Sequence, residues 1–402
     1  MSNSSKSPLM NSIFFTQQLI QATDTDHALR LVMEALEFIG FTCDLLEFNG
    51  VANLVASKKT TKSKKTLVFL GHVDVVPIGK KSSWKHDQGE LCMCCLRDDG
   101  YSCAIFDSSR MDEMCVYGRG AADMKGGIAS FLEAISNAKD IPQNVLLIIT
   151  SDEEGQAEYG TRAVIEHLIN QKKFPKPFFA LIGEPVSLKT PGDHVKIGSR
   201  GSLNVTVMAC GRSGHVAYSE YGLNPLHALL PLLQNVIDMR SKAKISETDI
   251  YGPTDIEVTS VDTANKARNM IPEAAVAKFN IRFNDDWLAE ELIDEIEKIF
   301  TNSEVKYKVL YDLAGEPYLS DISSGFDMLV DSCFEVTDIK PLVSANGANS
   351  DARFLTEICP FAEVGLLAGQ AHKINESANI RHIYNLSRIF YTFLKKVADN
   401  VW

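Results

Sequence analysis

The sequence predicts an α/β protein with a mostly parallel mixed sheet flanked by helices, interrupted by a smaller α+β insert of ferredoxin-like architecture. The first observation is that two nearly continuous apolar runs, "TLVFL" from Thr66 and "VLLIIT" from Val145, lie on either side of a stretch with helical spacing. Such alternation is typical of buried parallel strands joined by helices. The second observation is a change of pattern after about residue 191, where the strand-like runs become half-exposed.

Chain length and this change of pattern set the expected domain boundaries. At 402 residues the chain is longer than one core usually supports, so two domains are expected. We predict a discontinuous main domain of residues 1–191 and 312–402, interrupted by an insert of residues 192–311. In the insert, runs such as "SLNVTVMAC" and "AVAKFNIRF" share two helical stretches, near 224–240 and 286–300, which predicts one antiparallel sheet.

Each element of the main domain follows from a local pattern. Residues 11–40 have helical spacing with a break at Asp24 to Asp26, where an aspartate can cap a second helix. The stretch from Asn379 to Asp399 is predicted to be an amphipathic terminal helix. The other predicted elements are strands over 67–70, 114–117, 145–150, 178–182 and 358–367 and a helix over 124–140.

Composition and charge favour a small-molecule partner. The formal net charge of -12 disfavours binding to nucleic acid or to an anionic membrane, since both would repel the chain. No apolar run approaches the roughly 18 residues of a membrane-spanning helix, and the first residues lack a secretory pattern. The nine cysteines are odd in number, which fits reduced thiols. We therefore expect a cytoplasmic protein without nucleic-acid or membrane partners.

Three consecutive acids follow the apolar run that begins at Val145. Asp152, Glu153 and Glu154 stand where a buried strand should end. Adjacent, half-buried carboxylates are costly unless a cation or a proton-transfer reaction uses them. Taken alone, the three acids are better explained as a solvated turn, because acids are common in loops after strands.

Four strand-like segments of the main domain end in candidate metal ligands. They are followed by "GHVD", "GRGAADMKGG", "SDEEG" and "GEP". In an open α/β sheet the carboxyl ends of the strands meet at one edge, where ligands bind. With one distant histidine they supply imidazole and carboxylate donors that suit zinc and also accept manganese or cobalt. The candidate ligands are His72, Asp123, Glu154, Glu184 and His372.

These donors are sufficient for one or two metals. A carboxylate that bridges two metals would let both polarise one water, which lowers the pKa of that water. Asp74 lies two residues after His72, on the same side of an extended segment. We expect the Asp74 carboxylate to accept a proton from the other ring nitrogen of His72 and so orient the ligand.

Eight ordered motifs carry a resemblance to a known family. The chain resembles the di-zinc amidohydrolases and metallopeptidases of the aminoacylase and carboxypeptidase type, from about Leu67 onward. Three of the motifs favour the branch that removes a succinyl group over the deacetylases. The motifs are "GHVDVVP", "YGRGAADMKGG", "TSDEEG", "GEP", "GHVAY", "NMIP", "SDARF" and "AHKINE".

The resemblance implies two Zn²⁺ ions, for which Co²⁺ or Mn²⁺ can substitute. His72 and Glu184 would hold the first ion, Glu154 and His372 the second, and Asp123 would bridge both. The main domain would then be the zinc-binding catalytic domain, and residues 192–311 a lid and dimerisation domain. The implied reaction is hydrolysis of an acyl-amino acid by a metal-bridging water.

The resemblance also explains the adjacent acids. Glu153 would be the general base that takes a proton from the water and delivers it to the leaving amine, while its neighbour Glu154 binds metal. The family further implies a cis peptide bond between Asp123 and Met124.

Other positions match residues that the family uses on its substrate. The family forms a homodimer in which a histidine of the partner's lid reaches the reacting group; the match is His215 in "SGHVAY". Without the family, His215 is an ordinary surface-loop histidine. Guanidinium groups suit substrate carboxylates because they form two parallel hydrogen bonds. The expected substrate-binding residues are Arg200, Ser202, Asn269, Arg282, Ser350 and Arg353, together with Asn349, whose residue type differs from that of the family.

The chain departs from the family pattern in three places. Ser199 stands where many members have the first of two arginines before "GSL". Asn349 in "GANSDARF" replaces a hydroxyl residue near the acyl group. The segment 80–115 is longer than expected, and Cys92 and Cys95 have zinc-like spacing without a second close pair, so an ordinary reduced insertion is favoured.

Two alternatives to a desuccinylase therefore remain open. The first is a related deacylase or peptidase that acts on acetylornithine, another acyl-amino acid or a dipeptide, because the departures at Ser199 and Asn349 fall near the acyl group. The second is a non-catalytic scaffold of the same fold. The intact set of ligands and base argues against the scaffold.

Overall fold

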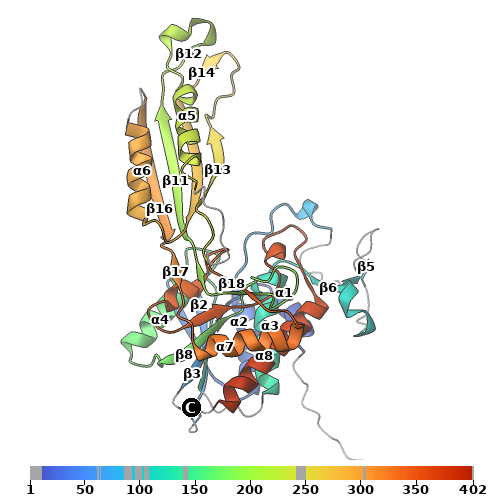
Figure 1. Ribbon diagram of the computed structural model, residues 1–402. Helices are drawn as coiled ribbons and strands as arrows, with labels where there is room; N and C mark the ends of the chain where they lie inside the picture. The colour runs from blue at the N-terminus through green and yellow to red at the C-terminus, as the bar shows by residue number, and fades with distance from the viewer. Residues whose placement is uncertain are drawn as a thin grey trace, which may run out of the picture. The chain divides into compact units, whose positions relative to one another are not determined.

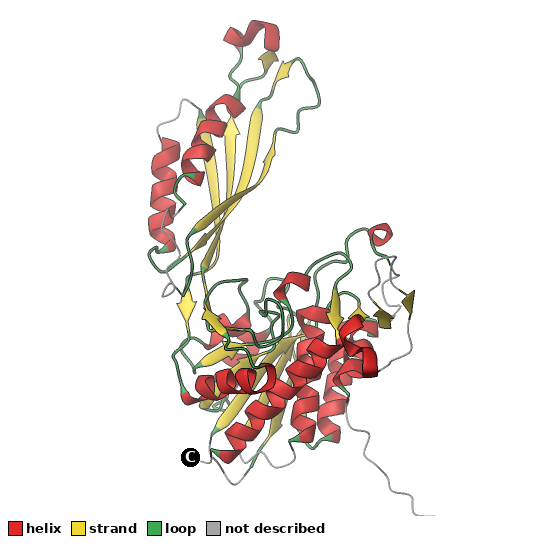
Figure 2. Cartoon of the chain, turned by 45° about the vertical axis from the view of Figure 1, so that its right-hand side comes forward, coloured by secondary structure: helices red, strands yellow, loops and turns green. Residues whose placement is uncertain are grey.

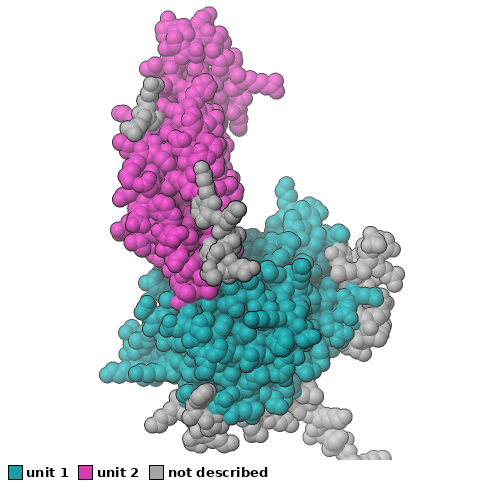
Figure 3. Space-filling model, viewed as in Figure 1, with its two compact units in different colours: residues 1–197, 320–344, 350–402 teal, residues 198–319, 345–349 magenta. Residues whose placement is uncertain are grey.

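The structure is a computed structural model of the 402-residue chain. The chain divides into two compact units (Figure 3). The first unit comprises residues 1–197, 320–344 and 350–402, and the second comprises 198–319 and 345–349. The structure describes residues 11–60, 63, 65–85, 93–95, 102–103, 108–138, 144–240, 250–301 and 305–400, with backbone only for 93–95, 102–103 and 108–110.

The first unit is built on an eight-stranded mixed sheet. Its central strands β7, β3, β8 and β19 are parallel neighbours, and an antiparallel hairpin of β1 and β2 lies at one edge. This arrangement confirms the predicted α/β class with a large, mostly parallel sheet. In sheet order the strands are β1 (Thr42–Phe48), β2 (Val51–Lys58), β7 (Asn144–Thr150), β3 (Thr66–His72), β8 (Pro177–Ile182), β19 (Phe361–Glu363), β9 (His194–Lys196) and β18 (Leu342–Ser344).

Helices cover this sheet (Figure 2). The parallel strands are buried on both faces, as their continuous apolar runs require; every residue of β3 is buried. On one face Phe69 of β3 stacks on Phe131 at 4.0 Å between ring centroids, and Phe390 meets Phe131 at 5.8 Å. The helices of the first unit are α1 (Ser12–Gln21), α2 (Thr25–Phe38), α3 (Gly126–Asn137), α4 (Thr161–Asn170), α7 (Ser324–Thr337) and α8 (Ile380–Asp399).

Two helix starts follow the capping rules. The Asp24 side chain accepts a hydrogen bond from the backbone N–H of His27 and begins α2, which confirms the predicted break. Asn379 accepts from the N–H groups of Arg381 and His382 and begins α8. Across the residues that the structure describes, no helix is long and apolar enough to span a membrane.

A second sheet of the first unit corrects one expectation. Strand β6 (Met114–Tyr117) precedes the motif "GRGAADMKGG". It does not belong to the main sheet. It pairs antiparallel with β20 (Ser377–Asn379) on one side and with β4 (Met93–Cys95) on the other, and β4 pairs with β5 (Ser102–Cys103). The side chains of Cys92 and Cys95, whose spacing resembled a zinc site, lie outside the described residues.

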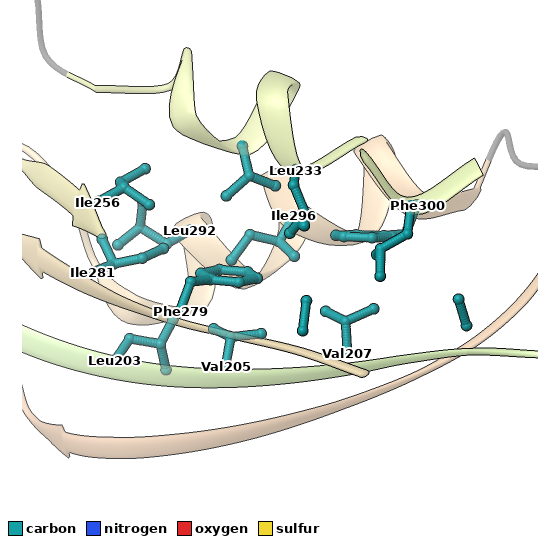
Figure 4. Close-up of a cluster of buried hydrophobic side chains, with 14 of the residues drawn as sticks. Leu203, Val205, Val207, Leu233, Ile256, Phe279, Ile281, Leu292, Ile296 and Phe300 are labelled. Carbon is teal, nitrogen blue, oxygen red and sulfur yellow. The ribbon is translucent and has the colours of Figure 1, made fainter. Parts of the chain in front are cut away.

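The second unit is an α+β structure with a four-stranded antiparallel sheet. Two helices, α5 (Pro225–Ile237) and α6 (Ala289–Thr301), pack on one face of that sheet (Figure 1), and side chains such as Leu233, Phe279 and Ile296 fill the space between (Figure 4). In sheet order the strands are β13 (Asp255–Asp262), β15 (Ala274–Phe283), β11 (Gly201–Cys210) and β16 (Lys306–Gly315).

Two small ladders complete the second unit. β12 (Gly214–His215) pairs with β14 (Met270–Ile271), and β10 (Gly198–Ser199) pairs with β17 (Tyr318–Leu319). The ten residues of β11 separate these ladders along the chain, a rise of roughly 30 Å for an extended strand.

Candidate metal centre

The ends of three neighbouring parallel strands bring candidate ligands together. His72 is the last residue of β3, Glu153 and Glu154 follow β7, and Glu184 follows β8. The approach of α3 to the end of β8 is close, because a Cβ built on Gly127 would lie 2.3 Å from the backbone oxygen of Gly183. The second glycine of "MKGG" is thus needed for the helix to pack beside the segment that leads to Glu184.

His72 lies at the centre of the first group of donors. Its Nε2 is 3.2 Å from Asp123 Oδ1, 3.6 Å from Glu184 Oε1 and 3.9 Å from Glu153 Oε2. Its Nδ1 donates to the backbone oxygen of Asp74 at 3.0 Å. That hydrogen bond holds a proton on Nδ1 and directs Nε2 at the carboxylates, the orientation that a metal ligand requires.

His372 forms a second group with the same aspartate. Its Nε2 is 2.8 Å from Glu154 Oε1 and 3.1 Å from Asp123 Oδ2. Asp123 therefore presents one carboxylate oxygen to each histidine. Ligand atoms of His72, Asp123 and Glu184 lie within 4.8 Å of one another, and so do those of Asp123, Glu154 and His372. A third group within the same limit, His72, Glu153 and Glu154, does not include Asp123. The Asp123 carboxylate, which the first two groups share, fits two cations on either side of it.

The charge of the cluster supports a cation. Its four carboxylate side chains, Asp123, Glu153, Glu154 and Glu184, are only 11–14% exposed. Burial, together with the neighbouring Asp123 carboxylate, raises the pKa of Glu184 well above its usual value. Burial and the neighbouring acids likewise raise the pKa of Glu153 to about 8, although His72 opposes the shift. Such crowding is unfavourable unless positive charge is held among the acids.

Carboxylates of the same cluster raise the pKa of both histidines. Burial alone would lower the pKa of His72, but the nearby Asp123, Glu184 and Glu153 raise it well above the usual value. The hydrogen bond that His372 donates to the Asp123 carboxylate, opposed by partial burial, raises the pKa of His372 to about 9. Nitrogen and oxygen donors without thiolate, with two sets of three that share Asp123, fit Zn²⁺, Co²⁺ or Mn²⁺.

Asp74 occupies a different position from the one we expected. Its carboxylate lies 3.7 Å from His72 Nδ1, farther than its own backbone oxygen. The carboxylate instead accepts hydrogen bonds from the backbone N–H groups of Glu153, at 3.1 Å, and Glu154, at 2.9 Å. Asp74 thus holds the loop that carries both glutamates. The Asp123–Met124 peptide bond is cis, as the family resemblance implied.

The expected substrate-binding residues of the second unit lie at two distant places within it. Ser202 on β11 pairs with Arg282 on β15, and Arg200 is the residue that precedes β11. His215 and Asn269 lie beyond the other end of β11, where Val216 donates to the backbone oxygen of Asn269. Within one chain the structure does not bring these two sets together.

The remaining predicted residues lie near the boundary in sequence between the units. Asn349 of the second unit accepts a hydrogen bond from Ser199 at 2.6 Å, so the two departures from the family pattern contact each other. In the first unit, Ser350 donates to the buried carboxylate of Glu363 at 2.9 Å, and Arg353 stacks on the ring of Phe354.

Sequence reasoning missed two buried ion pairs beside the centre. Arg119 Nη1 donates to Glu376 Oε2 at 2.7 Å, and Lys196 Nζ donates to Glu363 Oε1 at 2.6 Å. All four side chains are at most 6% exposed. A signal existed for the first pair, since Arg119 and Glu376 lie inside "YGRGAADMKGG" and "AHKINE".

Comparison with known proteins identifies the family. Residues 68–396 match the family described as peptidase family M20/M25/M40. The chain belongs to this family. Family membership makes the chain a hydrolase, and its cluster of histidines and carboxylates is a candidate metal-binding site of an M20 protein.

Curated M20 relatives match nearly the whole chain. The succinyl-diaminopimelate desuccinylase of Ehrlichia ruminantium (strain Gardel) is 34% identical over 399 residues, which cover 96% of this chain and 98% of that protein. The protein of the same name from Wolbachia pipientis wMel is 36% identical over 368 residues, which cover 89% of this chain and 84% of that protein.

Solved structures of M20 proteins share the fold. The metallo-carboxypeptidase Sso-CP2 of Sulfolobus solfataricus has a TM-score of 0.76 at 18% identity and covers 96% of this chain and 99% of that chain. The YXEP protein of Bacillus subtilis, described as a dinuclear metal-binding peptidase, has a TM-score of 0.63 at 11% identity, with 96% and 98% covered. At these identities the likeness establishes the M20 fold.

Proposed function

We propose that the chain hydrolyses the amide bond of N-succinyl-diaminopimelate and releases succinate and diaminopimelate, a reaction of lysine and cell-wall biosynthesis. The substrate is that named for relatives 34% identical to almost the whole chain. One observation carries the reaction class: two groups of three donors share Asp123 and are complete without Glu153, whose carboxylate forms a third group only with His72 and Glu154.

The donor groups fit two Zn²⁺ ions, with Co²⁺ or Mn²⁺ as substitutes. His72 and Glu184 would hold one ion, Glu154 and His372 the other, and Asp123 would bridge them. When bound, the ions polarise the amide carbonyl and lower the pKa of the attacking water.

Glu153 is proposed to move the proton of the reaction. Its carboxylate accepts a proton from the water as the C–O bond forms, and then gives that proton to the nitrogen as the C–N bond breaks. The second proton of the water leaves the new carboxyl group and is taken up by the amine, so the products are the succinate carboxylate and the ammonium form of the amine. Asp74 holds this base in position, because its carboxylate accepts the backbone N–H of Glu153.

Arg200 and Arg282 are proposed to bind substrate carboxylates, together with Ser202, which pairs with Arg282 across the sheet. Arg200 Nε and Arg282 Nη1 are buried and, within the described part of the chain, have no hydrogen-bond partner. Burial, together with the charge of Arg200, lowers the pKa of Arg282. Two neighbouring guanidinium groups with unused donors favour an anionic partner. Asn269, Asn349, Ser350 and Arg353 are proposed as further substrate contacts on the basis of the family resemblance.

A homodimer is proposed because His215 and Asn269 lie far from Arg200 within one chain. The separation along β11, roughly 30 Å, suggests that the two sets serve different active sites. We propose that residues 192–311 form the lid and dimerisation domain and that residues 1–191 and 312–402 form the catalytic domain. We also propose that the enzyme is cytoplasmic.

The contact between Ser199 and Asn349 favours a second candidate function. At 2.6 Å, their hydrogen bond occupies polar groups at both positions where the chain departs from the family. A related di-zinc deacylase or peptidase, acting on acetylornithine, another acyl-amino acid or a dipeptide, fits a changed acyl site. A scaffold without turnover is a minor third candidate.

The test is release of succinate from N-succinyl-diaminopimelate by purified, zinc-loaded protein, with acetylornithine and a chelated sample in parallel. Chelator-sensitive turnover of the succinyl substrate alone is the expected result. Turnover of acetylornithine alone would replace the proposed substrate by the second candidate. No turnover of either compound would exclude both as substrates and favour another acyl-amino acid, a dipeptide or the scaffold.

A further inference from the structure

The buried ion pair of Arg119 and Glu376, here called the clasp, contacts the segments that carry two candidate ligands. Glu376 is fully buried, and its Oε1 accepts hydrogen bonds from the backbone N–H groups of Ala122 at 3.0 Å and Asp123 at 3.2 Å. Its Oε2 accepts from Arg119. One carboxylate therefore fixes the backbone of the proposed bridging ligand and holds the guanidinium at the same time.

Arg119 holds the second ligand segment. Nη1 donates to the backbone oxygen of Lys373 at 3.1 Å, and Nη2 donates to that of His372 at 3.4 Å. The guanidinium carbon lies 5.2 Å from the ring centre of Trp84, which covers it. The arginine thus contacts the main chain of the ligand itself rather than its side chain.

Strand pairing explains how two distant motifs meet in the clasp. Ser377, the first residue of β20, pairs with Tyr117, the last residue of β6. The residue before β20, Glu376, consequently lies beside the residues after β6, and its backbone oxygen accepts from the N–H of Gly118 at 2.9 Å. The β6–β20 ladder thus ends beside the segments that carry Asp123 and His372.

The segment of His372 needs such support. His372 and Asn375 have φ values of 60° and 65°, in the left-handed region that non-glycine residues rarely adopt. The His372 side chain is also 51% exposed, whereas the other ligands are nearly buried. A half-exposed ligand on an unfavourable backbone loses its position easily when its main-chain contacts are removed.

We propose that the clasp is a positioning pair that sets the separation of Asp123 and His372, and with it the affinity for the metal that these two residues share. The inference rests on the proposed metal centre. It assigns Arg119 and Glu376 no contact with substrate. The clasp acts through the main chain of the two ligands.

The test measures Zn²⁺ affinity by competition with a chelator. The variant is Arg119→Met combined with Glu376→Gln, which leaves no unpaired charge and keeps an acceptor for the N–H groups of Ala122 and Asp123. We expect the dissociation constant of one of the two Zn²⁺ ions to rise roughly 10- to 100-fold, as for other outer residues of metal sites. Arg119→Lys, a milder change that keeps the charge, should give a smaller rise and serves if the double variant does not fold.

Two matched controls separate positioning from general stability. Arg381→Met removes an exposed guanidinium that pairs with Asp112 at 3.0 Å, next to the same β6 and β20 ladder. Leu36→Ala weakens the core of the first unit far from the ligands along the chain. Both controls should bind two Zn²⁺ ions with unchanged affinity, although Leu36→Ala lowers the unfolding temperature.

A further background shows which ligand the clasp acts on. In His372→Ala protein one Zn²⁺ site is already lost, and the clasp variant should cause little additional weakening of the other. The proposal is wrong if the clasp variants bind Zn²⁺ as the Arg381→Met control does, or if they weaken the remaining site by the same factor in the His372→Ala background.

The test of the clasp measures Zn²⁺ binding and not turnover. A negative result for the clasp is therefore distinguishable from a negative result for the proposed function. A protein that cleaves no succinyl substrate but shows the expected loss of one Zn²⁺ supports the clasp and not the substrate. A protein that cleaves the substrate while its clasp variants keep both ions supports the substrate and not the clasp.

Discussion

Replacing Glu153 by glutamine is expected to remove most turnover and leave both metals bound. The physical reason is its distance from the ligand set: Glu153 Oε2 is 3.9 Å from His72 Nε2, whereas Asp123, Glu154 and Glu184 lie 2.8–3.6 Å from a histidine Nε2. Glutamine keeps the shape of the side chain but cannot accept the proton of the attacking water.

The expected loss of turnover follows from the role assigned to Glu153. General acid–base catalysis contributes about 10²- to 10⁴-fold in rate. Since each tenfold change corresponds to about 1.4 kcal/mol, the barrier should rise by roughly 3–5 kcal/mol. Zn²⁺ affinity should change less than the roughly 10- to 100-fold seen when an outer residue of a metal site is lost.

The assay combines kcat with the metal content of the purified variant. Glu154→Gln is the comparison that should lose one ion. Asp152→Asn is the matched control, because the Asp152 carboxylate accepts from the N–H of Tyr159 at 3.0 Å and lies in the same acidic run. Loss of an ion from Glu153→Gln, to the extent seen for Glu154→Gln, would refute the assignment and exchange the roles of the two glutamates.

Three further predictions test other parts of the account. Removing metal with a chelator should lower the free energy of unfolding by about 2.7 kcal/mol for each site previously held at a 100-fold excess over its Kd, which thermal unfolding measures; an unchanged Tm would contradict a metal among these acids. Ser199→Ala removes the hydrogen bond to Asn349, which has a net value of about 0.5–1.5 kcal/mol. Its loss should change the kcat/KM ratio between succinyl and acetyl substrates by roughly two- to tenfold. An unchanged ratio would place Ser199 and Asn349 outside the acyl site. Mixing inactive Glu153→Gln and His215→Ala proteins should restore part of the activity through heterodimers, and absence of recovery after demonstrated subunit exchange would argue against His215 acting on its partner.

The fold was predictable where one local pattern decides the structure. The continuous apolar runs of β3 and β7 are buried on both sides in the sheet, as their composition requires. The partner of β6 was not predictable, because four buried residues form a strand equally well in either sheet. The β1–β2 hairpin was missed although its turn, Asn49–Gly50 with φ values of 50° and 83°, is a strong hairpin signal.

The candidate site was also predictable only in part. Strand ends in a parallel sheet indicated where His72 and Glu184 would meet, since topology alone brings those positions together. The hydrogen bonds of Asp74 could not be derived, because the alternation of side chains along a strand says nothing about which backbone N–H groups turn toward a carboxylate. The clasp likewise depends on one antiparallel ladder between segments 257 residues apart.

The central claim is that two metals are held by five residues with Asp123 between them and Glu153 left free. Anomalous diffraction at the zinc edge from crystals of the zinc-loaded protein tests it most directly. The account predicts two peaks, one among His72, Asp123 and Glu184 and one among Asp123, Glu154 and His372, with no metal–oxygen bond to Glu153. A single peak, or a peak coordinated by Glu153, would contradict it.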